Sequence, residues 1–486
     1  MTTSLLDNAP WQQHLFNGDW IKASNGNIDV IEPATGKILT SCGQANTQDV
    51  LKAASKAAKA QKEWMKVTPR DKAQVFLKAA DYLQQNFAEF SLIIARETGG
   101  IIPKGQLEIQ ETIVILQLAS NMVLQPNGVT LPSPVGRSST AKRMPLGVVG
   151  VISPFNFPMI LSSRSVAPAL ATGNAVVSKP DPQTPVSGGF LLAMALEHAG
   201  LPKGVYQVMP GGVDAGIAIC EAPEIGLVCF TGSTAAGRKV GEACGRNLKK
   251  VSLELGGKNS LIILEDADLD VAASNIAWGA FLHQGQICMA SGRILVHSSI
   301  APAITAKVIE KARHLPMGDP VSGSAIGPLI NEIQVQKVTQ IVEDSIAQGA
   351  VLEIGAWTDN LFYAPTVLTN VKPGMRCFEE EIFGPVANIV TFDNDEEAAK
   401  LANLGNYGLA AGIISNDVSR AIILGEQLNV GLLHINDQTV NDECINPFGG
   451  CGDSGNGSTV CGPSDWDLYT HWQWSTMRIT AQAKPF

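Results

Sequence analysis

The feature that most constrains this chain is a regular alternation of apolar runs and helical stretches that begins near residue 148. The stretches between the apolar runs have the length of ordinary helices, as in Gln183–Ala199 and Ala235–Arg246. Strands joined by helices of this length pair in parallel through right-handed crossovers. The pattern therefore predicts an α/β fold with a doubly wound, Rossmann-like sheet. The expected strands are Val148–Ser153, Ala175–Lys179, Val205–Met209, Leu227–Thr231 and Val251–Leu255.

A second α/β series, from about residue 260 to residue 449, predicts a second domain. Its apolar runs are Leu261–Leu264, Ile294–Val296, Ala387–Thr391, Ala411–Ile414 and Leu432–Ile435. Before the first series, Ala- and Lys-rich Thr47–Trp64 and the long amphipathic pattern Pro69–Thr98 predict two helices. The Pro/Gly/Ser-rich stretch Gln125–Ser139 predicts a hairpin or arm, and the aromatic-rich tail Asp465–Arg478 predicts a subunit or domain contact.

The composition excludes several classes of protein. Only 16% of the 486 residues are charged, against about 25% in ordinary soluble domains. A chain this long and this poor in charge can bury a large core and cover further surface in an oligomer, and it is not a disordered protein. The net charge of −10, without a run of basic residues, argues against a nucleic-acid or membrane partner.

Targeting and metal-binding signals are weak in this sequence. The first basic residue is Lys22, so we expect no secretory signal, and the apolar stretch Leu146–Leu161 is interrupted by prolines. Nine cysteines without a CxxC pair suit a reducing, cytoplasmic location. The seven histidines are scattered and predict no metal site.

Three residues have side chains that a carbonyl oxidation requires. Cys288 follows a helical run and is flanked by glycine and glutamine; a lone cysteine is more often a small buried hydrophobe. Glu254 stands inside an apolar strand, where a carboxylate needs a partner or a task. Asn156 lies in a proline-bounded turn just beyond a strand, where open α/β sheets bind ligands. A thiolate nucleophile, a carboxylate base and an amide donor for the oxyanion together predict oxidation of an aldehyde with a nicotinamide cofactor.

The glycine-rich segments leave alternatives open. Thr231-Gly232-Ser233 follows a strand and opens a helix, which allows a pyrophosphate to approach, although an ordinary tight turn has the same residues. The run Leu255-Gly256-Gly257-Lys258-Asn259 fails as a P-loop because Ser252 and Asn259 stand where glycine and Ser/Thr are required. His283 lies five residues before Cys288, a spacing that does not bring the two face to face on a helix.

Seven motifs, in order and at compatible spacing, resemble those of the aldehyde dehydrogenase superfamily over essentially the whole chain. They are Pro154-Phe155-Asn156-Phe157-Pro158, Lys179-Pro180, Phe230-Thr231-Gly232-Ser233, Leu253-Glu254-Leu255-Gly256-Gly257-Lys258, Gly285-Gln286-Ile287-Cys288, Glu380-Glu381-Ile382-Phe383-Gly384-Pro385 and Pro447-Phe448-Gly449-Gly450. Within the superfamily, Lys179-Pro180-Asp181-Pro182 and the run from His434 to Glu443 look most like benzaldehyde and vanillin dehydrogenases.

The resemblance assigns roles to individual residues. It implies Cys288 as nucleophile, Glu254 as general base and Asn156 as oxyanion donor. It implies contacts to NAD, or to NADP, from Ser153, Pro154, Phe155, Lys179, Gly212, Gly216, Gly232, Ser233, Gly237, Leu255, Glu381 and Phe383. It implies substrate contacts from Phe157, Arg164, Ile287, Met289 and Phe448.

The resemblance also implies an architecture. A cofactor domain would comprise residues 1–124 and 145–253, and a catalytic domain residues 254–460. Bridging segments at 125–144 and 461–486 would join a homodimer or homotetramer. Weaker discrimination against NADP is expected, because Pro182 replaces the acid that often stands three residues after the lysine, while Asp181 comes one residue early.

The expected substrate is a benzaldehyde-type aromatic aldehyde, because the residues beside Cys288 and Asn156 are apolar. Arg164 supports a different hypothesis, since semialdehyde dehydrogenases of the family bind a carboxylate with an arginine at this position; the guanidinium can instead pair with a structural acid. Two further alternatives are a catalytically silent relative and a cysteine-dependent hydrolase.

Overall fold

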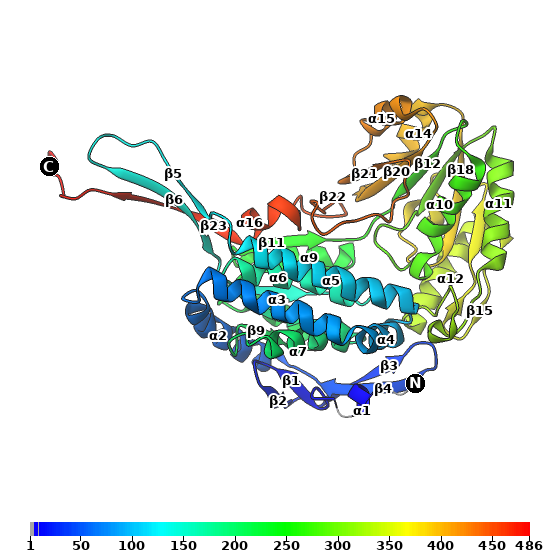
Figure 1. The fold of residues 1–486 in the computed structure, drawn as a ribbon. Coiled ribbons are helices and arrows are strands. Elements are labelled where there is room, and N and C mark those ends of the chain that lie inside the picture. The colour runs from blue at the N-terminus through cyan, green and yellow to red at the C-terminus, as the bar shows by residue number, and fades with distance from the viewer. Residues whose placement is uncertain (1–3, 8) are drawn as a thin grey trace.

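The computed structural model describes residues 4–7 and 9–486, which form two α/β bodies and a projecting arm (Figure 1). The first body is built on a sheet with the strand order β11-β10-β7-β8-β9-β1-β2. Its first five strands are parallel, whereas β1 and β2 pair antiparallel at one edge. The strands are β7 (Val148–Ile152), β8 (Ala175–Lys179), β9 (Tyr206–Val208), β10 (Ile225–Thr231), β11 (Lys250–Glu254), β1 (His14–Phe16) and β2 (Trp20–Lys22). All five predicted strands are present, and the Rossmann-like prediction is confirmed.

Helices cover both faces of this sheet. On one face lie α2 (Thr47–Trp64), α8 (Val213–Glu221) and α9 (Thr234–Arg246), and on the other α6 (Pro158–Ala171) and α7 (Leu191–His198), which continues a π-helical turn at Val186–Phe190. An outer layer of α3 (Pro69–Gln85), α4 (Phe87–Thr98) and α5 (Ile102–Met122) packs on α6 and α7. The hairpin β3 (Asn27–Glu32)–β4 (Lys37–Gly43) and the short α1 (Ser4–Asp7) precede them.

The stretch Pro69–Thr98 is two helices and not one. The chain leaves helical geometry at Asn86, where φ is −105° and ψ is 16°. The Asn86 side chain donates to the carbonyl of Tyr82 at 2.8 Å and so closes the last turn of α3. Since neither glycine nor proline marks this break, the amphipathic pattern runs through it. The prediction of a single long helix is wrong for this reason.

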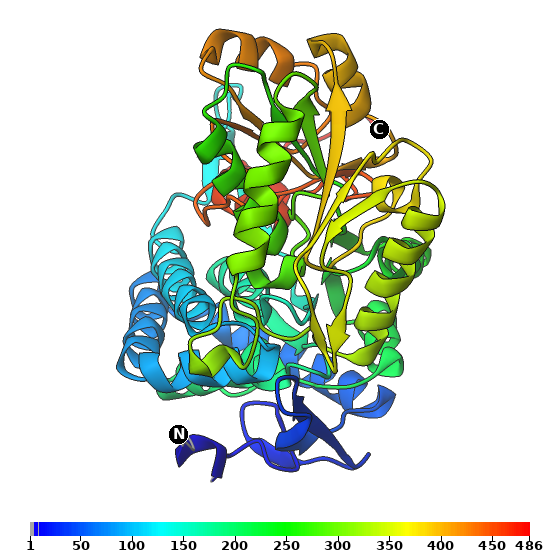
Figure 2. The ribbon, with the colours of Figure 1, turned by 90° about the vertical axis from the view of Figure 1, so that its right-hand side faces the viewer.

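The second body has a seven-stranded sheet of order β14-β17-β18-β13-β12-β20-β21, all parallel except the edge strand β14 (Figure 2). The strands are β12 (Ser260–Ile263), β13 (Arg293–His297), β14 (Val351–Ile354), β17 (Thr366–Thr369), β18 (Val386–Phe392), β20 (Ala410–Ile414) and β21 (Leu432–Ile435). The helices are α10 (Leu269–Phe281), α11 (Ala301–His314), α12 (Glu332–Ala347), α13 (Arg376–Glu379), α14 (Asp395–Ala402) and α15 (Val418–Gly425). The predicted second α/β series is therefore present.

The arm is a three-stranded antiparallel sheet of order β23-β6-β5 that projects from the first body (Figure 1). Its strands are β5 (Gly128–Thr130), β6 (Ser138–Pro145) and β23 (Thr470–Met477), so the predicted hairpin pairs with the aromatic tail. Trp472 and Trp474 are 50% and 65% exposed on the arm. The subunit contact of this tail stays a prediction.

The chain returns from the second body to close the first sheet. β11 is the edge strand, and the segment around residue 455 lies along its open side. Asn456 accepts from the amide of Leu253 at 3.1 Å and donates to the carbonyl of Val251 at 2.9 Å. The end of β11 forms a bridge with Gly455. This segment therefore takes up the hydrogen-bonding groups that an edge strand otherwise leaves free.

Candidate active site

Cys288 sits after an unusual turn that ends α10. His283, Gln284 and Gly285 have φ values of 46°, 56° and 67°, three consecutive left-handed residues. Two of them carry side chains, a strained arrangement that persists only where neighbours enforce it. Gln284 supplies that enforcement by donating to the carbonyls of Gly99 at 2.7 Å and Pro328 at 3.1 Å. The turn presents the half-buried Cys288 to a narrow pocket.

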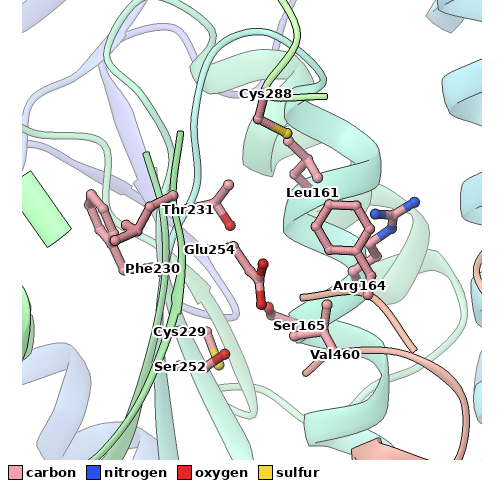
Figure 3. Close-up of a pocket in the computed structure, with 12 residues that line it drawn as sticks. Leu161, Arg164, Ser165, Cys229, Phe230, Thr231, Ser252, Glu254, Cys288 and Val460 are labelled. Atoms are coloured by element: carbon pink, nitrogen blue, oxygen red, sulfur yellow. The ribbon is translucent and has the colours of Figure 1, made fainter. Parts of the chain in front are cut away.

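This pocket, of about 20 Å³, brings Cys288 and Glu254 together (Figure 3). One wall comes from the first sheet through Phe230, Thr231 and Glu254, and the opposite wall from α6 through Leu161, Arg164 and Ser165. Phe448 and Val460 from the returning chain complete it. Sequence positions as far apart as 161 and 460 thus surround the Cys288 thiol and the Glu254 carboxylate, and the buried Cys229 is a second thiol on the wall.

Burial dominates the protonation of both groups. Burial, together with the nearby carboxylates of Glu381 and Glu254 and against the opposing charge of Arg164, raises the pKa of the Cys288 thiol to about 12. It also raises the pKa of Glu254 well above that of an ordinary carboxyl group, again against Arg164. Among the described residues, neither carboxylate oxygen of Glu254 has a hydrogen-bond partner. A carboxyl group in such a place is suited to exchange protons with a reacting group beside it.

Asn156 lies on the turn between β7 and α6 and is buried. Its Nδ2 donates one hydrogen to the carbonyl of Gln286 at 2.9 Å, two residues before Cys288. An amide NH₂ has two hydrogens, so one donor remains for a second acceptor. The structure therefore ties the predicted oxyanion donor directly to the turn that carries the predicted nucleophile.

A buried ion pair supports the turn between β7 and α6 that carries Asn156. Glu108 on α5 accepts from the amides of Met159 and Ile160 at 2.9 and 3.2 Å, in the first turn of α6. Its other oxygen pairs with Lys104 at 2.5 Å, and both side chains are almost fully buried. The sequence analysis missed these two residues, although two opposite charges four apart in an apolar helix are a usable signal.

Asn259 is a second positioning residue that sequence reasoning missed. Its Nδ2 donates to the carbonyls of Cys288 at 2.8 Å and Ala290 at 2.9 Å, and its Oδ1 accepts from the amide of Ala410. Gly257 faces the same carbonyl so closely that a Cβ there would lie 2.5 Å from it. The Gly-Gly-Lys-Asn run, which failed as a P-loop, therefore packs against and orients the turn of Cys288.

The residues predicted to bind the cofactor lie in two groups. Most follow the carboxyl ends of β7, β8, β9, β10 and β11 or lie in the first turn of the helices after them. Gly212 and Ser233 are the N-caps of α8 and α9, and Lys179 ends β8 with its Nζ bonded to the Pro180 carbonyl at 3.1 Å. The other members of this group are Ser153, Pro154, Phe155, Gly216, Gly232, Gly237 and Leu255.

Glu381 and Phe383 form the second group, in the loop after α13. Glu381 accepts from the amide of Gly257 at 3.1 Å, and the ring of Phe383 meets Phe155 edge-on with 5.9 Å between centroids. The two groups therefore touch through the Phe155–Phe383 contact. Their arrangement fits a dinucleotide, since two helix N-termini face the carboxyl edge of the sheet and the Ser153 hydroxyl is buried without a partner among the described residues.

The residues predicted to contact substrate divide between the pocket and its surroundings. Arg164 and Phe448 line the pocket with Cys288. Phe157 instead meets the ring of His283 edge-on at 5.2 Å, Ile287 lines a cavity beside Glu381, and Met289 is buried in the core. Substrate contacts of these last three stay predictions.

Arg164 is paired with an acid from the other body. Its guanidinium donates to the carboxylate of Asp442, 278 residues along the chain, and both are largely buried. The ring of Phe448 lies 5.3 Å from the guanidinium carbon. The sequence left two partners open for this arginine, the carboxylate of a substrate or a structural acid. In the structure its partner is a structural acid, Asp442.

His283 does not support cysteine–histidine chemistry. Burial and the nearby Lys104 lower its pKa well below the ordinary value, so the ring is neutral. Its two ring nitrogens are buried and have no hydrogen-bond partner within the described part of the chain, Cys288 included. In residues 4–7 and 9–486 there is no group of histidine, cysteine and acidic side chains able to hold a metal ion, nor a helix long and apolar enough to cross a membrane.

A model of the aldehyde dehydrogenase family matches residues 20–475 of the chain. The chain belongs to the aldehyde dehydrogenase family. A vanillin dehydrogenase from an Amycolatopsis species is 47% identical over 99% of this aldehyde dehydrogenase and 100% of the relative. A benzaldehyde dehydrogenase [NAD(+)] from Pseudomonas putida is 46% identical over 98% of both chains.

Solved structures agree with the family assignment. The betaine aldehyde dehydrogenase of Staphylococcus aureus in complex with NAD⁺ superposes with a TM-score of 0.96 at 27% identity, over 100% of this chain and 98% of that one. A putative aldehyde dehydrogenase from Burkholderia cenocepacia reaches 0.94 at 32% identity, over 98% and 99%. The predicted family and its fold are confirmed.

Proposed function

We propose that this aldehyde dehydrogenase oxidises aromatic aldehydes of the benzaldehyde type to carboxylic acids with NAD. The observation that carries the proposal is the single narrow pocket in which Cys288 and Glu254 lie, with Arg164 already neutralised by Asp442. The vanillin and benzaldehyde dehydrogenases that are 46–47% identical support the substrate class, and the second supports NAD.

The proposed reaction begins at the Cys288 sulfur. With its pKa raised to about 12, the thiol is protonated at rest and must lose its proton as it attacks the carbonyl carbon. Glu254, unpaired and beside it in the pocket, is the base that we assign to this step. The second hydrogen on Asn156 Nδ2 stabilises the oxyanion of the thiohemiacetal.

The second half of the reaction releases the acid. NAD, when bound, supplies the acceptor for the hydride that leaves the thiohemiacetal carbon, and a thioester on Cys288 remains. Glu254 first passes the proton taken from Cys288 to solvent and then takes a proton from the water that attacks the thioester. The tetrahedral adduct expels the Cys288 thiolate as the carboxylic acid forms, and Glu254 returns its proton to the sulfur, which regenerates the thiol. The apolar walls from Leu161, Phe448 and Val460 keep other water away from the thioester.

The contacts to NAD are assigned by position. Gly212, Gly216, Gly232, Ser233 and Gly237 allow the pyrophosphate to approach the N-termini of α8 and α9. Lys179 would meet the adenosine ribose. We assign the nicotinamide side to Glu381 and Phe383, together with Ser153, Pro154, Phe155 and Leu255. The same domain supports NADP as a weaker cofactor.

The alternatives are less well supported. A semialdehyde substrate would bring its carboxylate to an arginine that already pairs with Asp442. A hydrolase would require a histidine partner for Cys288, which His283 is not. We further propose a cytoplasmic homodimer or homotetramer joined through the arm, whose exposed Trp472 and Trp474 offer an apolar contact.

Initial rates of NAD reduction with benzaldehyde test the proposal, with a Cys288→Ser variant and a Glu254→Gln variant beside the native enzyme. Cys288→Ser should abolish turnover, because a serine hydroxyl is far harder to deprotonate. Glu254→Gln should keep a burst of NADH at most and lose steady turnover. Full activity in either variant, or hydrolysis of esters faster than aldehyde oxidation, contradicts the assignment.

A further inference from the structure

Cys220 and Cys244 are two buried, free thiols on neighbouring helices. Cys220 lies one residue before the end of α8, and Cys244 lies two residues before the end of α9. The two helices pack against each other, and the two residues are 2% and 0% exposed. Each thiol is a side-chain hydrogen-bond partner of the other. Two sulfur atoms that are already neighbours need only a small shift to reach the geometry of a disulfide.

Lys249 joins the ends of the two helices beside this pair. Its amide donates to the carbonyl of Cys244 at 3.0 Å, and its Nζ donates to the carbonyl of Ala222, the C-cap of α8. A cation beside a thiol favours the thiolate, which is the form that reacts with an oxidant. The hydrogen bond with Cys220 lowers the pKa of Cys244, and the charge of Lys249 lowers it further, against burial. The pair therefore contains one thiol suited to react first and a second thiol in contact with it.

The chain between the two cysteines contains part of the proposed cofactor site. It comprises β10 and the turn Gly232-Ser233 that opens α9. Both cysteines lie near the C-terminal ends of their helices, away from the N-caps to which we assign the pyrophosphate. A bond between them would close this segment into a loop, and closing a loop stabilises a fold by restricting the unfolded chain.

We propose that Cys220 and Cys244 form an oxidation site at which hydrogen peroxide produces a reversible disulfide between α8 and α9. The Cys244 thiolate attacks one peroxide oxygen, the O–O bond breaks, and the hydroxide that leaves takes up the thiol proton as water. Cys244 is then a sulfenic acid. The sulfur of Cys220 attacks the sulfur of Cys244, the S–S bond forms, and hydroxide leaves with the Cys220 proton as a second water. The two thiols lose two electrons, and the peroxide gains them.

The reverse reaction needs a thiol reductant. A thiolate of an added dithiol attacks one sulfur of the disulfide, and its second thiol releases the protein from the mixed disulfide. Both cysteines return to thiols while the dithiol is oxidised to its own disulfide.

The test treats the native enzyme with a small excess of hydrogen peroxide and maps its cysteines by mass spectrometry. Free thiols are alkylated with one reagent, disulfides are then reduced, and the released thiols are alkylated with a second reagent. We expect Cys220 and Cys244 to carry the second label together. Without reduction, their two peptides should appear joined, about 2 Da lighter than their sum. Treatment with dithiothreitol before alkylation should return both cysteines to the first label.

Variants separate the two roles. In Cys244→Ala, Cys220 should stay a free thiol under the same treatment. In Cys220→Ala, Cys244 should stop at the sulfenic acid, which dimedone labels. Cys42→Ala removes a different buried thiol, on β4, and is the matched control that should form the disulfide to the native extent.

Thermal unfolding measures the effect of closing the loop. Peroxide should raise Tm of the native enzyme by about 2–4 °C relative to the change that it causes in Cys220→Ala. This difference removes the effect of oxidation at other residues, because both proteins receive the same treatment.

The outcomes are distinct from those of the proposed function, because none of them is a rate of aldehyde oxidation. A disulfide between Cys220 and Cys244 that dithiothreitol reduces supports the inference. Two free thiols at a peroxide dose that oxidises Cys288, or bonds from this pair to other cysteines, overturn it. A complete disulfide without the rise in Tm overturns the closing of the loop. If the alanine variants do not fold, the map of the native enzyme decides alone.

Discussion

Removing the charge of Glu108 should destabilise the enzyme more than any surface change of the same kind. Glu108→Gln keeps the shape of the side chain and one oxygen for the amides of Met159 and Ile160. It leaves Lys104 as a buried ammonium without its counter-ion. The variant therefore tests whether this pair, which no solvent screens, supports the turn that carries Asn156.

The magnitude follows from the burial of the pair. The two side chains are 3% and 0% exposed, and breaking such a pair from one side costs about 3–5 kcal/mol. Burial already lowers the pKa of Lys104, and loss of Glu108 lowers it further, so deprotonation of the amine limits the cost at higher pH. With an unfolding entropy of about 2.1 cal/mol/K per residue over 486 residues, the expected fall in Tm is about 3–5 °C.

The assay is thermal unfolding followed by fluorescence at pH 7, at one scan rate because large chains often unfold irreversibly. The matched control is Glu242→Gln, which removes the acid of an i,i+4 pair with Arg246 that is 60–69% exposed. That change should cost about 0.5 kcal/mol or less, too little to move Tm clearly. Equal Tm values for the two variants would refute the reasoning. A fall in kcat for Glu108→Gln at temperatures where it is folded would show that Asn156 has moved.

Three further outcomes are expected. Gly257→Ala should lower kcat at least tenfold in steady-state assays with little effect on NAD binding, because the new Cβ would lie 2.5 Å from the carbonyl oxygen of Cys288. An unchanged kcat would contradict the close packing of these two residues. Asp442→Asn should move the acidic limb of the pH profile of kcat/KM to lower pH. The negative charge of Asp442 raises the pKa of Glu254, and Glu254 acts as a base in its ionised form. A shift to higher pH would show that another group titrates. Asp181→Ala should increase kcat/KM with NADP relative to NAD, because one carboxylate near the expected ribose site is lost; an unchanged ratio would remove Asp181 from cofactor choice.

Local sequence patterns predicted many of the helices and strands. Thr47–Trp64 has the predicted bounds because Asn46 caps its first turn and its apolar positions repeat at helical spacing. The central strands β7 and β8 of the first sheet are buried along their whole length, as expected when helices cover both faces. The break at Asn86 was missed because neither glycine nor proline stands there and the apolar pattern continues into α4.

A functional residue could be predicted only where the residues next to it in the sequence are enough to identify it. Cys288, Glu254 and Asn156 stand in short runs that can be read without a structure. The partner of Arg164 could not be found in this way, because Asp442 is 278 residues distant and nothing local in either segment requires the other. Asn259 was visible in the sequence, but its bonds to the turn of Cys288 depend on how β12 meets that turn.

The closure of β11 by the segment around Gly455 has a consequence during synthesis. At about 5–20 residues per second, roughly 10–40 s separate translation of Glu254 from translation of its bridge partner. Throughout that interval the first sheet, whose parts are complete, has one bare edge that can pair with another nascent chain. Chains stalled before residue 456 would have a folded first body, no closed pocket and an unpaired edge at β11. We therefore expect these chains to depend on chaperones more than the complete chain does.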